Sequence, residues 1–229
     1  KYMKKIIVSI IILFSISSYA ISHVEHYQSF DYLEYELFRN NKSIGYHKYN
    51  FEREKNKLVV KSEVQFKITK LGVDLYRYFA KSDEIYKNNV FFKFSSITDQ
   101  NNKQKFVNID LDPIDNKLTI NGSSYQGKTS SKNIVGTWWN HEIINAKAQI
   151  SAISGRIIEQ EVLFIGKEQI LIGDKTFNTL HFKFKSSDSS LPENKKLNTD
   201  IWYEENSYLW VKAAFDKRGY WEYRLKTYK

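Results

Sequence analysis

Residues 58–68, which read Leu-Val-Val-Lys-Ser-Glu-Val-Gln-Phe-Lys-Ile, alternate between apolar and polar side chains. Successive residues of a β-strand point to opposite faces, so this alternation predicts a strand with one face in a core and the other in water. The apolar row consists of Leu58, Val60, Val64, Phe66 and Ile68, with Ser62 among them. We therefore expect this strand to lie within a sheet that is buried on one side.

The same alternation recurs along the chain, with turn residues between the runs. Further alternating runs occupy residues 107–111, 180–185, 209–215 and 221–225. The turn signals include Asn40-Asn41, Asn88-Asn89, Asn101-Asn102 and Arg218-Gly219. Asn and Gly tolerate the positive φ angles of tight hairpins, so neighbouring runs should pair in antiparallel order. We count about 11 or 12 strands and find no helical pattern of the kind that joins parallel strands.

One stretch, at about residues 123–155, departs from this pattern. It reads as a loop followed by one short helix at about 139–147, which carries Trp138 and Trp139 at its start. A large amphipathic sheet needs a partner to bury its apolar face. The sequence thus predicts an all-β fold, a large antiparallel meander that curls into a sheet, barrel or half barrel around this insert.

The first twenty residues have the pattern of an export signal. Lys4 and Lys5 precede an apolar run, and small residues lead to Ala20. This pattern is typical of a secretory signal peptide cut near Ala20, and the run is short for a membrane span. We expect a signal peptide at 1–20, one antiparallel β domain at 21–229, and a periplasmic or secreted protein with no transmembrane helix after cleavage.

Composition narrows the chemistry and the partners. The chain of 229 residues has no cysteine, which excludes disulfides, a thiol nucleophile and a cysteine-linked lipid anchor. The formal net charge is +9, of which the first twenty residues supply three lysines. The remaining lysines are spread along the chain without a dense basic run, so we expect no nucleic-acid partner. The oligomeric state is not indicated.

The abundant aromatic residues suggest where a ligand would bind. An apolar pocket in the mouth of a barrel suits a hydrophobic or lipid-like molecule, and an envelope component is a second kind of partner. The ligand-binding candidates are Trp138, Trp139, His141, Trp202, Trp210 and Tyr223. We predict no cofactor, and the leading hypothesis is an exported, non-enzymatic binding protein.

Histidines provide one alternative, a hydrolase that uses His141 as a base. No Gly-x-Ser-x-Gly motif or zinc-binding spacing accompanies it, so we assign no catalytic or metal-binding residue. His23 and His26 lie beside the expected cleavage site, where a solvated tail is expected. His47 and His181 have charged neighbours, which predicts an exposed strand face.

A second alternative is an outer-membrane β-barrel, because its strands alternate in the same way. Glu84 argues against this, since it shares a face with Tyr76, Tyr78, Ala80 and Tyr86. A carboxylate on a lipid-facing surface would be costly. The final residues also lack an aromatic end in register.

Several short motifs together resemble one bacterial family. They are residues 41–47 (Asn-Lys-Ser-Ile-Gly-Tyr-His), Tyr76-Arg77-Tyr78 with Glu84, Thr137-Trp138-Trp139-Asn140, residues 200–203, Trp210-Val211 and Tyr223-Arg224-Leu225. Asn41 replaces a glycine of the family pattern. The chain resembles the exported bacterial family described as domain of unknown function 6134. The resemblance implies an antiparallel β architecture in the cell envelope and brings no catalytic residues. The shape it implies is similar to the half barrels of envelope lipoprotein carriers.

Overall fold

The computed structural model describes residues 27–229, most of which belong to one sheet of fifteen strands. The first half of the chain supplies β1 (Tyr32–Arg39), β2 (Lys42–Glu54), β3 (Lys57–Lys70), β4 (Val73–Lys87), β5 (Val90–Gln100), β6 (Lys103–Asp112), β7 (Lys117–Gly122) and β8 (Gln126–Ser130). The second half supplies β9 (Ile134–Val135), β10 (Ala148–Ile150), β11 (Ile157–Ile172), β12 (Lys175–Ser186), β13 (Asn198–Glu204), β14 (Trp210–Asp216) and β15 (Tyr220–Tyr228). Short 3-10 helices lie at η2 (His141–Asn145) and η3 (Glu193–Lys195).

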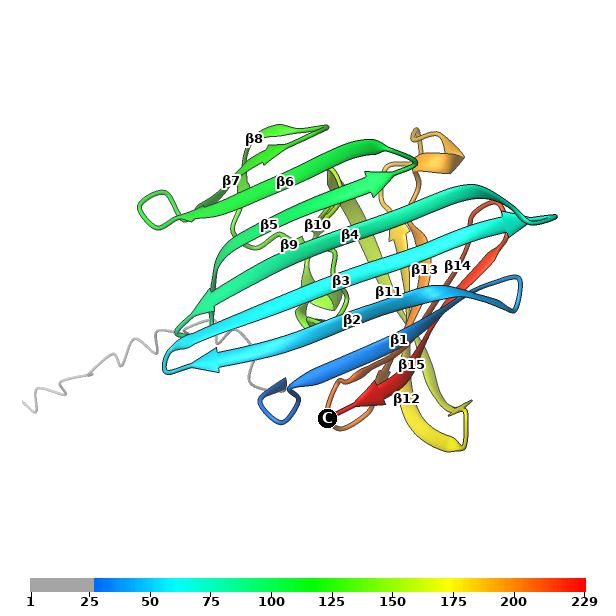
Figure 1. The fold of residues 1–229 in the computed structure, drawn as a ribbon. Helices are drawn as coiled ribbons and strands as arrows, with labels where there is room; N and C mark the ends of the chain where they lie inside the picture. Colours follow the sequence, from blue (N-terminus) through cyan, green and yellow to red (C-terminus); the bar gives the residue numbers. More distant parts are fainter. Residues whose placement is uncertain (1–26) are drawn as a thin grey trace, which may run out of the picture.

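The sheet is continuous and open. Its strand order is β8-β7-β6-β5-β4-β3-β2-β1-β15-β14-β13-β12-β11-β10-β9. The first and last strands pair in the middle, with Tyr35 of β1 opposite Leu225 of β15. Figure 1 shows β2 to β6 in front and β11 to β14 behind them at a steep angle, so that the sheet curls around its concave face. The prediction of an all-β, curled sheet with hairpin connections is confirmed.

Three details differ from the sequence prediction. The strand count was too low, because the short strands β8, β9 and β10 lie in the stretch 123–155 that reads as a loop. β9 and β10 pair in parallel, whereas the prediction was entirely antiparallel. The expected helix at 139–147 is a 3-10 helix of only five residues, η2. Its N-cap is Asn140, whose side chain accepts a hydrogen bond from the backbone N–H of Glu142.

The predicted asparagine turns adopt the expected geometry. Asn40 and Asn41 have φ angles of 48° and 61°, and Asn88 and Asn89 have φ angles of 49° and 62°. Two consecutive left-handed residues match the right-handed twist of the flanking strands. These turns therefore set the register of the β1–β2 hairpin and of the β4–β5 hairpin.

The core lies on the concave face in two adjoining clusters. The larger surrounds Trp139 and includes Leu33, Tyr49 and Trp210, all fully buried. The smaller lies under β5 to β7 and is centred on Phe94. The outer face instead carries ion pairs, such as Lys61 with Glu52 at 2.8 Å and Lys81 with Glu63 at 3.1 Å. The concave face of the sheet is therefore apolar and the outer face carries charged side chains, as the alternation at 58–68 predicts.

The signal-peptide prediction for residues 1–20 and the pair His23 and His26 lie outside the described residues. Within residues 27–229, no helix is long and apolar enough to cross a membrane.

Candidate functional site

Residues 137–143, here called the plug, occupy the concave side of the sheet. The hydroxyl of Tyr49 donates to the carbonyl oxygen of Thr137 at 2.6 Å. The hydroxyl of Tyr203 donates to the carbonyl oxygen of Trp138 at 2.9 Å. Both tyrosines are fully buried, so these bonds satisfy backbone groups that water cannot reach. Strand side chains thus fix the backbone of the plug from opposite walls of the sheet.

Glu84 of β4 is a buried carboxylate that anchors the plug. Its Oε2 accepts hydrogen bonds from the indole Nε1 of Trp139 at 2.9 Å and from the hydroxyl of Thr137 at 3.2 Å. Its Oε1 accepts a bond of 2.5 Å from the hydroxyl of Tyr86. Burial raises the pKa of Glu84, and these three donors oppose the rise. The group binds the plug to the sheet, and its oxygens are already engaged.

Trp138 forms part of a second surface beside the plug. Its φ of 58° is a left-handed conformation that is unusual for a bulky side chain. Its ring meets those of Trp210 at 5.5 Å and Tyr223 at 5.6 Å between centroids, both nearly perpendicular. Trp210 in turn stacks on Tyr35 at 4.0 Å. The left-handed backbone therefore directs the indole of Trp138 toward the end of the sheet where it meets the rings of β14 and β15.

Four further aromatic residues face one another at that end. Phe66 stacks on Tyr78 with ring centroids 4.7 Å apart and meets the edge of Trp221 at 5.3 Å. Trp221 stacks on Phe215 at 5.9 Å. β3 and β15 are separated by two strands in the sheet, so the contact between Phe66 and Trp221 reaches across the concave face.

We call this surface the aromatic basin. Its walls are Phe66, Tyr78, Phe215 and Trp221, and its floor is His47, Trp138, Trp210 and Tyr223. Trp210 is fully buried, whereas the four wall residues are only half-buried. The basin is thus a cluster of aromatic rings on the concave side of the sheet, buried below and partly exposed to solvent above.

Three nitrogens at the floor are buried and have no hydrogen-bond partner among the described residues. They are His47 Nδ1, Trp138 Nε1 and Trp210 Nε1. Buried polar atoms are nearly always paired, and an indole N–H can only donate. The floor therefore holds buried indole donors that no acceptor of the described residues satisfies.

His47 is part of the floor and not of an exposed strand face, so that prediction was wrong. It lies opposite Tyr35 in the sheet, and its ring is 4.3 Å from that of Tyr49. Its Nε2 lies 2.8 Å from Ser62 Oγ. Burial lowers the pKa of His47 to about 3, which keeps the ring neutral near pH 7. The charged neighbours in sequence, such as Lys48, point to the other face.

The structure brings together three of the six predicted ligand-binding residues, Trp138, Trp210 and Tyr223, at the floor. Trp139 lies beneath them in the core. His141 is buried, stacks on Tyr208 at 4.4 Å and lies 3.6 Å from Glu142.

Trp202 does not belong to the basin. It lies on the outer face, because its neighbours Ile201 and Tyr203 point into the core. There it stacks on His181 at 4.3 Å, and His181 bridges Glu168 and Asp200.

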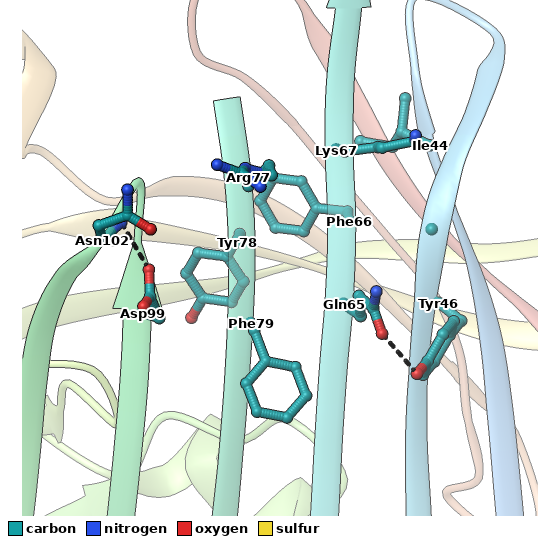
Figure 2. Close-up of a pocket in the computed structure, with 11 residues that line it drawn as sticks. Ile44, Tyr46, Gln65, Phe66, Lys67, Arg77, Tyr78, Phe79, Asp99 and Asn102 are labelled. Carbon is teal, nitrogen blue, oxygen red and sulfur yellow. Dashed lines mark hydrogen bonds between the residues drawn. The ribbon is translucent and has the colours of Figure 1, made fainter. Parts of the chain in front are cut away.

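A groove of about 630 Å³ adjoins the basin (Figure 2). Phe66 and Tyr78 of the basin walls contribute to it, together with Lys67 and Arg77 near the β3–β4 turn. Its lining also includes residues of the outward-facing row, among them Tyr46, which donates to Gln65 Oε1 at 3.0 Å. Most of its lining, including Gln65 and Phe79, belongs to that outward-facing row, so the groove lies mainly on the outer face, and we assign only its inward-facing aromatics to the basin.

Phe66, His47 and Glu84 are site residues that the sequence-based candidates omit. Phe66 stands on the apolar row of residues 58–68, and Glu84 shares the parity of Tyr78. Odd or even position along the strand therefore predicts that both side chains face the core. It does not show which of the inward-facing residues lie beyond the plug. Among residues 27–229, no cluster of three His, Cys, Asp or Glu side chains could hold a metal ion.

The family model described as Domain of unknown function (DUF6134) matches residues 35–226. The chain belongs to this family. A search of the curated proteins found no match to the DUF6134 chain.

Solved structures show the fold alone. The crystal structure of a β-barrel-like protein of domain of unknown function DUF1849 from Brucella abortus matches with a TM-score of 0.60 at 10% sequence identity. The match covers 86% of the DUF6134 chain and 96% of the Brucella chain. A DUF1329 family protein from Desulfovibrio piger matches at 9% identity over 90% of this chain and 88% of that chain. Its TM-score is 0.19, too low to indicate a shared fold.

Proposed function

We propose that this DUF6134 chain is an exported, non-enzymatic protein that binds a hydrophobic, lipid-like molecule in the aromatic basin. The observation that carries the proposal is the half-buried wall of Phe66, Tyr78 and Trp221 on an otherwise packed concave face. Burying apolar surface is worth about 25 cal/mol per Å², and concave aromatic surfaces are typical of ligand sites. A ligand on the basin would complete the burial that the plug provides elsewhere.

The floor indicates a second property of the ligand. The indole nitrogens of Trp138 and Trp210 are donors without partners, and His47 is neutral with its Nε2 beside Ser62. A carbonyl or ester oxygen at the floor would accept from these groups. The ligand class is therefore an apolar molecule that carries a hydrogen-bond acceptor, as many lipids do.

The other two hypotheses have less support. A lipid-facing outer surface would place the ion pairs of Lys61 with Glu52 and Lys81 with Glu63 in hydrocarbon, where charges are costly. Catalysis by His141 would require access to a ring that is buried and stacked on Tyr208. The proposal of export rests on the sequence pattern of residues 1–20. A component of the cell envelope is an alternative partner for the basin.

The test is a titration of the protein, expressed as the full chain, with N-phenyl-1-naphthylamine, a neutral dye that brightens in apolar surroundings. Native mass spectrometry of the freshly purified protein would show whether a lipid copurifies. We expect dye binding by the wild type and about tenfold weaker binding for Phe66→Ala or Trp221→Leu.

The matched control is Phe106→Ala, because Phe106 is 42% exposed on the outer face opposite Ile97. Its affinity should equal that of the wild type, and thermal unfolding should show that each variant is folded. Equal dye affinity for all variants, or no binding together with no copurifying lipid, would reject the proposal.

A further inference from the structure

The β3–β4 hairpin ends in an apolar tip that serves no core. Leu71 is 95% exposed, Val73 is 61% exposed and Leu75 is 55% exposed. Figure 1 shows this hairpin extending beyond the neighbouring β1–β2 turn. Single exposed apolar residues are ordinary, but three at the tip of one hairpin form a patch that suits a binding role.

The backbone of the tip is also strained, although asparagine would adopt the same turn with less strain. Leu71 has a φ of 52° and Gly72 a φ of 78°. The chain uses Asn40-Asn41 and Asn101-Asn102 at equivalent turns, and asparagine tolerates this conformation better than leucine does. A leucine here gains neither turn stability nor burial within the chain. The residue therefore fits a contact outside the chain.

Basic residues lie on the tip hairpin and on the hairpin across the basin. Lys67, Lys70 and Arg77 lie on the hairpin, and Lys217 and Arg218 lie on the β14–β15 turn. The contact of Phe66 with Trp221 places these two hairpins on opposite sides of the basin. Burial and the positive charges of Arg156 and Arg218 lower the pKa of Lys217.

Fewer carboxylates lie at this end of the sheet to offset the positive charges. Asp74 lies 3.8 Å from Lys67, and Asp99 accepts a hydrogen bond from the backbone of Asn102. The opposite end differs, since the turn after β6 has Lys128 bridging Asp112 and Asp115. Around the tip, the basic residues Lys67, Lys70, Arg77, Lys217 and Arg218 therefore outnumber the nearby carboxylates Asp74, Asp99 and Asp216.

We propose that this end docks on a membrane surface that contains anionic lipids. Leu71, Val73 and Leu75 enter the headgroup boundary, while Lys67, Lys70 and the β14–β15 turn contact the anionic headgroups. An apolar tip framed by basic residues has both components that interfacial binding needs. The mouth of the aromatic basin then faces the bilayer, and only this last statement rests on the proposed function.

The test measures flotation of the purified full-chain protein with lipid vesicles. Vesicles of phosphatidylcholine with about one third phosphatidylglycerol are compared with pure phosphatidylcholine. We expect binding to the anionic vesicles only, and its loss at about 1 M salt, where the Debye length is about 3 Å. Leu71→Asn should weaken binding about tenfold, since it removes the inserted side chain.

Two variants keep the outcome decisive. Leu71→Asn suits the left-handed turn and should keep or raise the melting temperature, so weaker binding cannot reflect unfolding. Ile114→Asn is the matched control, because Ile114 is 92% exposed on the β6–β7 turn at the other end. It should bind vesicles like the wild type.

Absence of wild-type flotation, or equal binding by both variants and the wild type, would overturn the docking proposal. Self-association that Leu71→Asn abolishes would assign the tip to a second copy and overturn it as well. Dye binding without vesicles tests the basin separately, because Leu71 lies outside its walls and floor.

Discussion

Trp139 donates its indole N–H to the carboxylate of Glu84 at 2.9 Å, and this bond joins the plug to β4. The two residues are separated by 55 positions in the sequence. Trp139 is fully buried and Glu84 is 2% exposed, so neither group can exchange this bond for water. Their pairing fixes how deep the plug lies and, with it, where the basin floor begins.

The first prediction concerns the energy of this pairing. Trp139→Phe keeps a ring but removes the donor, and Glu84→Gln replaces one acceptor oxygen with an amide NH2 group. A buried hydrogen-bonding group that loses its partner costs about 1–3 kcal/mol, so each variant should lower the free energy of unfolding by about 2 kcal/mol. The double variant should lose less than the sum, by about 1 kcal/mol. Urea unfolding of the four proteins measures this coupling, and strict additivity would contradict it.

The second prediction is a pH dependence that Glu84 causes. Burial raises the pKa of Glu84 in the folded protein above the ordinary 4.5. The folded state then holds the proton more tightly than the unfolded state, so the contribution of Glu84 is greatest below pH 4.5. It is lost as the pH rises through the folded value.

Glu84→Gln does not titrate, and it provides the comparison. The melting temperature of the wild type should fall relative to that of Glu84→Gln as the pH rises above 4.5. Parallel pH profiles for the two proteins would show that Glu84 titrates normally.

The strands and turns could be predicted because they depend on local chemistry. The alternation at 58–68 follows from the two faces of β3, and Asn40-Asn41 from the positive φ of a tight turn. The turn at Leu71-Gly72 was not predicted, because a leucine gives no local signal for it. The strand β9 has two residues and depends on pairing with β10, which no short-range pattern reveals.

The site was predicted only in part, because its residues meet through contacts between strands that the local sequence does not show. Trp138 and Trp210 were recognised as aromatic candidates, but the sequence could not show that Trp202 faces outward while Ile201 faces the core. The role of His47 depends on its register with Tyr35 in β1, a contact between strands. Charged neighbours along the chain suggested exposure, whereas alternation in the sheet places the ring inside.

The third prediction is an acid sensitivity that His47 causes. Burial lowers the pKa of His47 from the ordinary 6.5 to about 3. The unfolded state then binds the proton more readily, so the contribution of His47 is complete above pH 6.5 and is lost as the pH falls toward 3. His47→Gln should lose less stability than the wild type between pH 7 and pH 4, an interval chosen to bracket the unfolded value.

Urea unfolding at the two pH values measures this difference. The comparison is best made in the Glu84→Gln background, because Glu84 titrates in the opposite sense. An equal loss of stability with and without His47 would contradict the prediction.

The last prediction links the backbone of β2 to the basin wall. Gly45 lies opposite Phe66, and a Cβ at this position would be 2.6 Å from both Cα and Cβ of Phe66 and closer still to the carbonyl oxygen of Gln65. The nearest atoms belong mainly to the backbone, so β3 must shift to accommodate any side chain.

Gly45→Ala should therefore lower the free energy of unfolding by about 1–3 kcal/mol and displace Phe66 from Tyr78 and Trp221. The indole emission of Trp221 should change with this displacement. This emission is the difference in fluorescence between Gly45→Ala and Gly45→Ala/Trp221→Phe, and it is compared with the same difference in proteins that keep Gly45. Dye affinity should fall together with it, because the wall loses its central ring. Unchanged stability and unchanged dye affinity in Gly45→Ala would show that β2 and β3 are not so closely packed beside the basin.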